Sequence, residues 1–381
     1  MAPAFSIYLD LVRFVAACLV VVYHSNSRLI VEAPLPFSQY GHSAVIIFFV
    51  LSGYVIAFTT ATKERNAKVY WASRLSRVLS LALPAVLLTP LLDLIGESLA
   101  PALYAGNTTH GLAWLRVLSS LLFLNEIWSV SIMSFSNIAY WSLNYEVWYY
   151  VLFSIYIFGS PSRRWAWIGL VAALIGPKIL LLAPVWSAGV LIYRWQGAQR
   201  MPEWAAWLGL VASFILFYAF EQSRLADLVS EQLKTFLGTS LHRELAFSKW
   251  VFTDYLLTLI VCLNFVCMRR IARRYASLAL TLERPVRAAA SYTFSIYLLH
   301  QPLIYFWAAL IDLPPTGYVR YAAVMAGVFA SIVLIGSLTE RRRFALRQYI
   351  FAILSRIEAS GVARRWIVKD PSSAGLDGRS S

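Results

Sequence analysis

The chain has 381 residues, of which 59% are hydrophobic and only 14% are charged. Soluble globular domains have about a quarter of their residues charged, so this composition excludes an ordinary soluble protein and indicates an integral membrane protein. The formal net charge is +14, but the basic residues lie in short segments between apolar stretches, which is typical of membrane orientation and not of nucleic-acid binding.

Apolar stretches that approach the length needed to cross a bilayer, about 20 residues, recur along the whole chain. They cover residues 8–27, 42–61, 78–95, 138–158, 165–182, 184–195, 203–221, 249–268, 288–310 and 318–339. The stretch 184–195 is short and would need its flanking residues or a tilted path. We therefore expect an all-α, polytopic integral membrane protein with about ten transmembrane helices.

One further apolar segment, 111–128, decides the orientation of everything after it. If it does not cross the membrane and the N-terminus is cytoplasmic, the basic clusters all fall on the inner side, as the positive-inside rule requires. These clusters lie in residues 63–77, 163–164, 194–200, 269–287 and 341–343. We therefore expect 111–128 to be a re-entrant or interfacial segment, and both termini to be cytoplasmic.

The domain organisation follows from the same pattern. Residues 1–340 form the predicted transmembrane domain, with a polar outer loop at 221–248. Residues 341–370 form a basic cytoplasmic tail, in which apolar residues at helical spacing over 344–358 predict an amphipathic helix on the inner surface. The composition of 371–381 predicts disorder.

Ionisable residues inside the apolar stretches are the first candidates for chemistry, because they are costly in lipid. Arg13 and His24 lie in the first stretch, roughly 16 Å apart along a helix axis. His24 could serve as a general base near neutral pH. The alternative is structural, with His24 in helix packing and Arg13 as an interface anchor that reaches phosphate headgroups.

Two motifs follow on the second and third stretches. Ser52 and Gly53 are small residues in the middle of a helix, where a neighbouring helix or an acyl chain can approach closely. Arg74 and Arg77 share one helix face at the inner boundary, where guanidinium groups could bind phosphate or serve only as inner-leaflet anchors.

Two polar clusters lie in the later stretches. The first opens the fourth stretch and contains Trp141, Asn144, Tyr145 and the only formally charged side chain there, Glu146. By the expected topology Glu146 lies in the outer half of the membrane, as His24 does, so its carboxylate could orient the histidine. The alternative is a structural ion pair.

The second cluster lies in the ninth stretch and contains Tyr297, His300 and Pro302. Pro302 frees a backbone carbonyl one turn earlier. The cluster could equally be a satisfied polar patch in helix packing. The cysteines Cys18, Cys262 and Cys267 lie in apolar stretches, and their spacing predicts neither disulfides nor a metal site.

Taken together and in this order, the motifs resemble the membrane acyltransferase 3 family. Its patterns are matched by an arginine and a histidine separated by ten residues, Phe-Phe-x-x-Ser-Gly from residue 48, Arg-x-x-Arg from 74, Trp-Ser-Leu-x-x-Glu from 141, and a Tyr-x-x-Tyr-Leu-x-His-like element. The last element departs from the family pattern, since this chain has Ser-Tyr-Thr-Phe-Ser-Ile-Tyr-Leu-Leu-His over 291–300.

The resemblance implies an O-acyltransferase that moves an acyl group, most commonly acetyl, from cytoplasmic acyl-CoA to a hydroxyl of a cell-envelope or exported glycan. It implies no permanently bound cofactor, and acyl-CoA is a co-substrate. His24, Glu146 and Arg13 would be catalytic, with Glu146 orienting His24, while Arg74, Arg77, Ser52 and Gly53 would bind the donor. The remaining candidates, assigned to the acceptor, are Trp141, Asn144, Tyr145, Tyr297 and His300.

Direct transfer and an acyl-histidine intermediate are both open routes. The expected location is the bacterial inner membrane, with the lipid bilayer and envelope-assembly proteins as partners. Two other functional classes use the same buried charges: a proton-coupled transporter or flippase of a glycan or lipid-linked substrate, and a non-enzymatic scaffold. The absence of repeated halves in the sequence and the inner arginine pair favour the enzyme.

Overall fold

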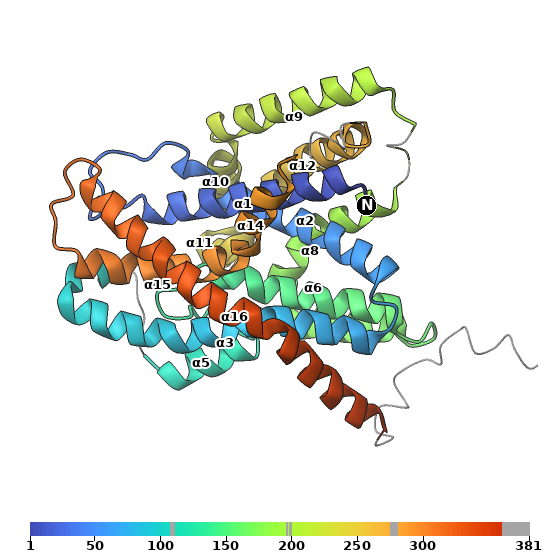
Figure 1. Ribbon diagram of the computed structural model, residues 1–381, viewed down its shortest axis with the longest axis horizontal. Coiled ribbons are helices and arrows are strands. Elements are labelled where there is room, and N and C mark those ends of the chain that lie inside the picture. The colour runs from blue at the N-terminus through green and yellow to red at the C-terminus, as the bar shows by residue number, and fades with distance from the viewer. Residues whose placement is uncertain (107–110, 196, 198–199, 275–280, 360–381) are drawn as a thin grey trace, which may run out of the picture.

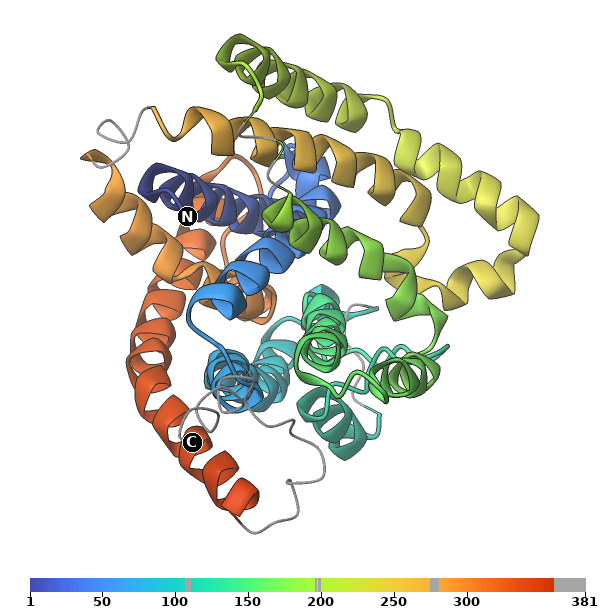
Figure 2. The same ribbon diagram turned by 90° about the vertical axis from the view of Figure 1, so that its right-hand side faces the viewer.

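The computed structural model describes residues 1–106, 111–195, 197, 200–274 and 281–359, and this part of the chain is a bundle of helices without a β-strand (Figures 1 and 2). The only bridge found there is isolated, between Ser134 and Asn137. The helices in chain order are α1 (Pro3–Ser25), η1 (Ser38–Tyr40), α2 (Gly41–Thr62), α3 (Ala67–Leu99), α4 (Pro101–Tyr104), α5 (Ala113–Leu121), α6 (Tyr140–Phe158), α7 (Arg164–Ile175), α8 (Pro177–Arg194), α9 (Glu203–Gln222), α10 (Leu225–Leu237), α11 (Thr239–Glu244), η3 (Ala246–Ser248), α12 (Val251–Ile271), α14 (Glu283–Ser291), α15 (Thr293–Leu310) and α16 (Val319–Ala359).

Six segments in the described part are long and apolar enough to cross a membrane: α1, η1 with α2, α3, α9, α12 and α16. The helices α6, α8 and α15 have 19, 18 and 18 residues, which corresponds to lengths of roughly 27–29 Å. The all-α, multi-pass prediction is therefore confirmed, while the count of ten spans stays a prediction.

The predicted boundary between the fifth and sixth stretches is wrong. We expected 165–182 and a short 184–195, but α7 ends at Ile175 and α8 runs from Pro177 to Arg194. Gly176 separates them with a φ of 81°, a conformation that favours glycine, and Pro177 starts the next helix where no backbone N–H is needed. The short helix is therefore α7, with 12 residues.

The segment 111–128 contains only the nine-residue helix α5. Nine residues rise about 14 Å, which is too short for a hydrocarbon core of about 30 Å. The residues after α5 are fixed by Glu126 and Lys178, a fully buried ion pair at 2.7 Å. The predicted outer loop 221–248 is also more ordered than expected, since it contains α10, α11 and η3.

The helix α2 occupies the centre of the bundle and packs against α1, α8 and α12. Its crossing with α8 is very close, because a Cβ added to Gly53 would lie 2.0 Å from the Trp186 carbonyl oxygen, and one added to Gly189 would lie 2.0 Å from the Val50 oxygen. Two facing glycines thus allow backbone contact between these helices. This contact fixes α2, the helix that carries Ser52.

The last helix, α16, has 41 residues and is therefore about 60 Å long, far more than a bilayer core requires. The amphipathic helix expected over 344–358 is the second half of this continuous helix. Figure 1 shows α16 running along the outside of the bundle, with its final turns near the same end as the N-terminus of α1. The rest of the predicted tail, 360–370, and the predicted disordered segment, 371–381, lie outside the described residues.

The orientation can be tested with two matched alanine-to-cysteine variants. Ala67 begins α3 at the end that we expect to be cytoplasmic, and Ala33 is exposed in the connection between α1 and α2 at the opposite end. In intact cells, a membrane-impermeant thiol reagent should label Ala33→Cys and spare Ala67→Cys, which should react only after permeabilisation. The wild-type chain gives the background from its own cysteines, and the reverse labelling pattern would overturn the orientation.

Candidate active site

Six of the twelve predicted site residues line a cavity of about 70 Å³ between α1, α2, α3, α6 and α15. A single ordered water needs roughly 10–15 Å³ on this measure, so the cavity has room for a small group. Its polar lining consists of Arg13, Ser52, Arg74, Arg77, Ser142, Glu146, Tyr150, Thr293 and Tyr297.

Glu146 is the hydrogen-bond centre of this cavity. It accepts a hydrogen bond from the Ser52 hydroxyl, and a second one at 2.6 Å from the Tyr150 hydroxyl. The Trp186 indole N–H donates to Ser52 at 3.2 Å. Ser142, Glu146 and Tyr150 are spaced by four residues on α6, so they share the helix face that lines the cavity.

Three arginines contribute to the same cavity, and they differ in their partners. Arg74 is 5% exposed, pairs with Glu64 and donates to the Thr59 hydroxyl at 3.1 Å. Arg13 lies 3.5 Å from Asp10 on its own helix. Among the described residues, the Arg77 guanidinium has neither an ion-pair nor a hydrogen-bond partner.

In the sequence analysis Arg74 and Arg77 were equivalent candidates for binding phosphate. In the structure they differ in their ion-pair partners. The Arg74 charge is already balanced by a buried carboxylate, whereas Arg77 remains available to an anion.

A second cavity, of about 190 Å³, adjoins the first. The two cavities share Val55, Arg74 and Arg77, so these residues lie between them. The rest of the second lining is Thr59, Lys63, Glu64 and Ser73 from the α2–α3 region, and Arg343, Phe344 and Arg347 from α16. Basic side chains thus dominate this second cavity.

The two predicted histidines lie together, close to the C-terminal end of α1. The helix begins at Pro3, earlier than expected, so Arg13 lies at its middle and His24 in its last turn. The rings of His24 and His300 are 5.1 Å apart between centroids. The partner that the sequence predicts for His24 is a carboxylate, Glu146.

The hydrogen bonds of His300 define its tautomer. Its Nδ1 lies 2.8 Å from the Tyr297 carbonyl and 3.0 Å from that of Ile296, so Nδ1 must carry the proton that is donated to them. In the neutral ring Nε2 is then an unprotonated acceptor, and it is buried without a hydrogen-bond partner among the described residues. His300 thus directs a free basic nitrogen into the protein interior.

Among the described residues, Glu146 and His24 do not form a hydrogen bond or an ion pair with each other. The hydrogen-bond donors to Glu146 are Ser52 and Tyr150, while the aromatic neighbours of His24 are Tyr23 and His300. The expected orientation of the histidine by Glu146 is therefore corrected.

Tyr297 connects the cavity with the histidines. It lines the cavity, hydrogen-bonds to Ser142 at 2.5 Å, and its ring lies 6.3 Å from that of His300.

Pro302 frees the backbone carbonyl of Leu298, one turn earlier on α15, as the sequence predicted. That carbonyl accepts a hydrogen bond from the Asn137 side chain at 2.8 Å.

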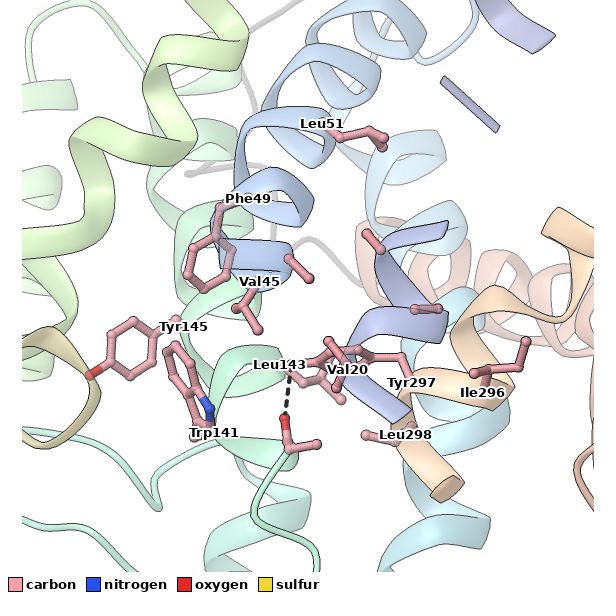
Figure 3. Close-up of a cluster of buried hydrophobic side chains, with 14 of the residues drawn as sticks. Val20, Val45, Phe49, Leu51, Trp141, Leu143, Tyr145, Ile296, Tyr297 and Leu298 are labelled. Atoms are coloured by element: carbon pink, nitrogen blue, oxygen red, sulfur yellow. Dashed lines mark hydrogen bonds between the residues drawn. The ribbon is translucent and has the colours of Figure 1, made fainter. Parts of the chain in front are cut away.

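Four predicted ligand-binding residues do not line the cavity. Trp141 stacks on Phe247, Asn144 donates to the Asn125 side chain, and the Tyr145 hydroxyl hydrogen-bonds to Ser248. Figure 3 shows Trp141 and Tyr145 gathered with Phe49, apart from Tyr297. Gly53 lies against α8. All four therefore have packing or hydrogen-bonding roles in this structure, and their part in donor or acceptor binding stays a prediction.

Sequence reasoning missed Ser142, Tyr150 and Glu64. Helical spacing from Glu146 would have found Ser142 and Tyr150, because four residues make about one turn. Glu64 carried a weaker signal, as a single acidic residue among the basic residues of 63–77.

The comparisons with known proteins show similarity to acyltransferases. The family model described as an acyltransferase domain, Acyl_transf_3, matches residues 6–340. The acyltransferase MdmB of Streptomyces mycarofaciens is 30% identical over 199 residues, which are 48% of this chain and 49% of that protein. The match therefore spans about half the length of that curated relative. No solved structure matches.

The different environments of Arg74 and Arg77 predict different effects on stability. Arg74→Ala leaves Glu64 buried without its partner, which costs about 3–5 kcal/mol, so the thermal unfolding midpoint in detergent should fall clearly. Arg77→Ala should leave that midpoint nearly unchanged. Adding Glu64→Ala to Arg74→Ala should recover part of the loss. Equal midpoints for the two single variants would contradict the assignment.

Proposed function

Since this chain belongs to the acyltransferase 3 family, as its motifs predicted, we propose that it transfers a short acyl group, acetyl above all, from acyl-CoA to a hydroxyl of a cell-envelope or exported glycan. The observation that carries the proposal is the pair of adjoining cavities. One is basic and suits a polyanionic donor, and the other is small and is lined in part by Tyr297, whose ring lies next to His300, the neighbour of His24.

The donor side is supported by charge. The second cavity is lined by five basic side chains and one carboxylate, Glu64, which is paired with Arg74. The guanidinium group of arginine can donate two parallel hydrogen bonds to phosphate oxygens. Acyl-CoA carries a diphosphate and a 3′-phosphate. This cavity lies where α2 ends and α3 begins, the end that the positive-inside rule assigns to the cytoplasm.

The thioester end would enter the first cavity. A volume of about 70 Å³ has room for an acetyl or similarly short group. Arg77 and Arg13 would neutralise the donor's negative charge near the cavity. The hydrogen bonds of Glu146 with Ser52 and Tyr150 would fix the polar wall of the cavity. The reactive carbonyl would then lie toward Tyr297.

The acceptor hydroxyl would be activated at the histidines. In the direct route His24 removes the hydroxyl proton while the oxygen attacks the thioester carbon. The C–O bond forms, the C–S bond breaks, and the CoA thiolate leaves and takes up the proton from the imidazolium. In the alternative route a ring nitrogen first displaces the thiolate, and the acceptor then takes the acyl group from the histidine.

His300 replaces Glu146 as the partner of His24 in this scheme. Its Nδ1 proton is held by the backbone and its Nε2 has no hydrogen-bond partner among the described residues, so this nitrogen is available to accept a hydrogen bond from the adjacent His24 ring when that ring turns toward it. We therefore assign His300 as a positioning residue.

The central test measures labelled acetyl-CoA consumption and product formation in inverted membrane vesicles without any ion gradient. His24→Ala should abolish transfer, because no other side chain in the scheme replaces the base, while the protein still accumulates. His242→Ala is the control, since His242 hydrogen-bonds to Ser230 in the outer helices, away from the cavities. Near-normal transfer by His24→Ala, or a strict requirement for a gradient, would contradict the proposal and favour a transporter.

Glu146→Gln should reduce turnover at least tenfold, because it removes the charge facing the arginines while keeping the size of the side chain. The pH profile of the remaining activity should not shift, since Glu146 does not contact His24. Its thermal unfolding midpoint serves as the control for folding. A clear shift of the profile toward higher pH would instead mean that Glu146 does act on the histidine.

A further inference from the structure

The second half of α16 is docked on the protein. Lys68, at the start of α3, forms an ion pair with Glu358 at 2.8 Å, and its ammonium group lies 5.0 Å from the centre of the Phe351 ring. Ile350 on the same stretch is 8% exposed. This part of α16 therefore has a defined place beside α3.

That place makes α16 one wall of the second cavity. Arg343, Phe344 and Arg347 line it from α16, opposite Lys63 and Arg77. Arg347 is exposed, and Phe344 is 70% exposed although it is aromatic. A basic wall with an open aromatic ring combines the two groups that bind nucleotides, a cation for phosphate and a flat surface for the base.

The order of groups along acyl-CoA matches the order of residues along the two cavities. The acyl end is followed by the pantetheine arm, the diphosphate, and then the ribose with its 3′-phosphate and adenine. Arg77 lies between the two cavities, which suits the diphosphate. The α16 wall lies beyond it, where the 3′-phosphate and adenine would follow.

We propose that the cytoplasmic half of α16 completes the donor site, with Arg347 binding the 3′-phosphate of acyl-CoA and Phe344 stacking on its adenine. This inference rests on the proposed function and adds residues beyond the family motifs. It makes α16 the element that distinguishes acyl-CoA from donors that lack the 3′-phosphate.

The test measures binding of acetyl-CoA and of 3′-dephospho-acetyl-CoA to the full chain in phosphatidylcholine nanodiscs. The wild type should bind acetyl-CoA more tightly. Arg347→Ala should weaken acetyl-CoA binding about tenfold, as expected for one lost charge-assisted contact, and leave the dephospho form nearly unchanged. Phe344→Ala should weaken both forms to a similar extent.

Arg356→Ala is the matched control, because Arg356 is exposed on the same helix and does not line the cavity. If Arg347→Ala binds both donors like the wild type while Arg77→Ala does not, the α16 wall is refuted and the proposed function stands. If the wild type binds neither donor, the proposed function itself fails.

The same phosphate chemistry could serve a lipid headgroup, so the measurement is repeated with phosphatidylglycerol added to the nanodiscs. Unchanged discrimination between the two donors supports the nucleotide. Loss of acetyl-CoA binding in phosphatidylglycerol that is relieved by Arg347→Ala would assign Arg347 to lipid and overturn the proposal.

Discussion

Burial of charge in an apolar bundle is the constraint on which the rest of this structure depends. A carboxylate or guanidinium in the hydrocarbon region is costly unless it is paired or faces a polar cavity. Glu146, Arg13, Arg74 and Arg77 all line one cavity, with Ser52 and Tyr150 donating hydrogen bonds to the carboxylate. Five helices must therefore meet at one place, and the close crossing of α2 and α8 keeps Ser52 there.

The sequence predicted the helical fold because long apolar stretches in a membrane have few alternatives. It failed where a local feature decided the geometry. The break between α7 and α8 depends on the left-handed conformation of Gly176, which the apolar composition of 165–195 conceals. Likewise, the start of α1 at Pro3 moved Arg13 to the helix centre and His24 to its end, which changed their neighbours.

At the site, residue types predicted the members but not their partners. Arg74 and Arg77 look equivalent in sequence, yet among the described residues Glu64 pairs only with Arg74. Glu146 and His24 were paired because they lie at similar depth, but depth says nothing about which helix faces meet. The contact between His24 and His300 joins residues 24 and 300, and no local pattern predicts such a pair.

The pair of Asp10 and Arg13 bears on how the protein is made. Chains are synthesised from the N-terminus, so α1 enters the membrane long before Glu146, Arg77 or His300 exist. Asp10 lies one turn before Arg13 on the same helix, 3.5 Å away, and so partly neutralises the arginine within a single inserting segment. When the later helices assemble, Arg287 approaches Asp10 to 3.1 Å, so the Asp10 carboxylate gains a second cationic partner. Arg13 can then contribute its charge to the cavity of the folded protein.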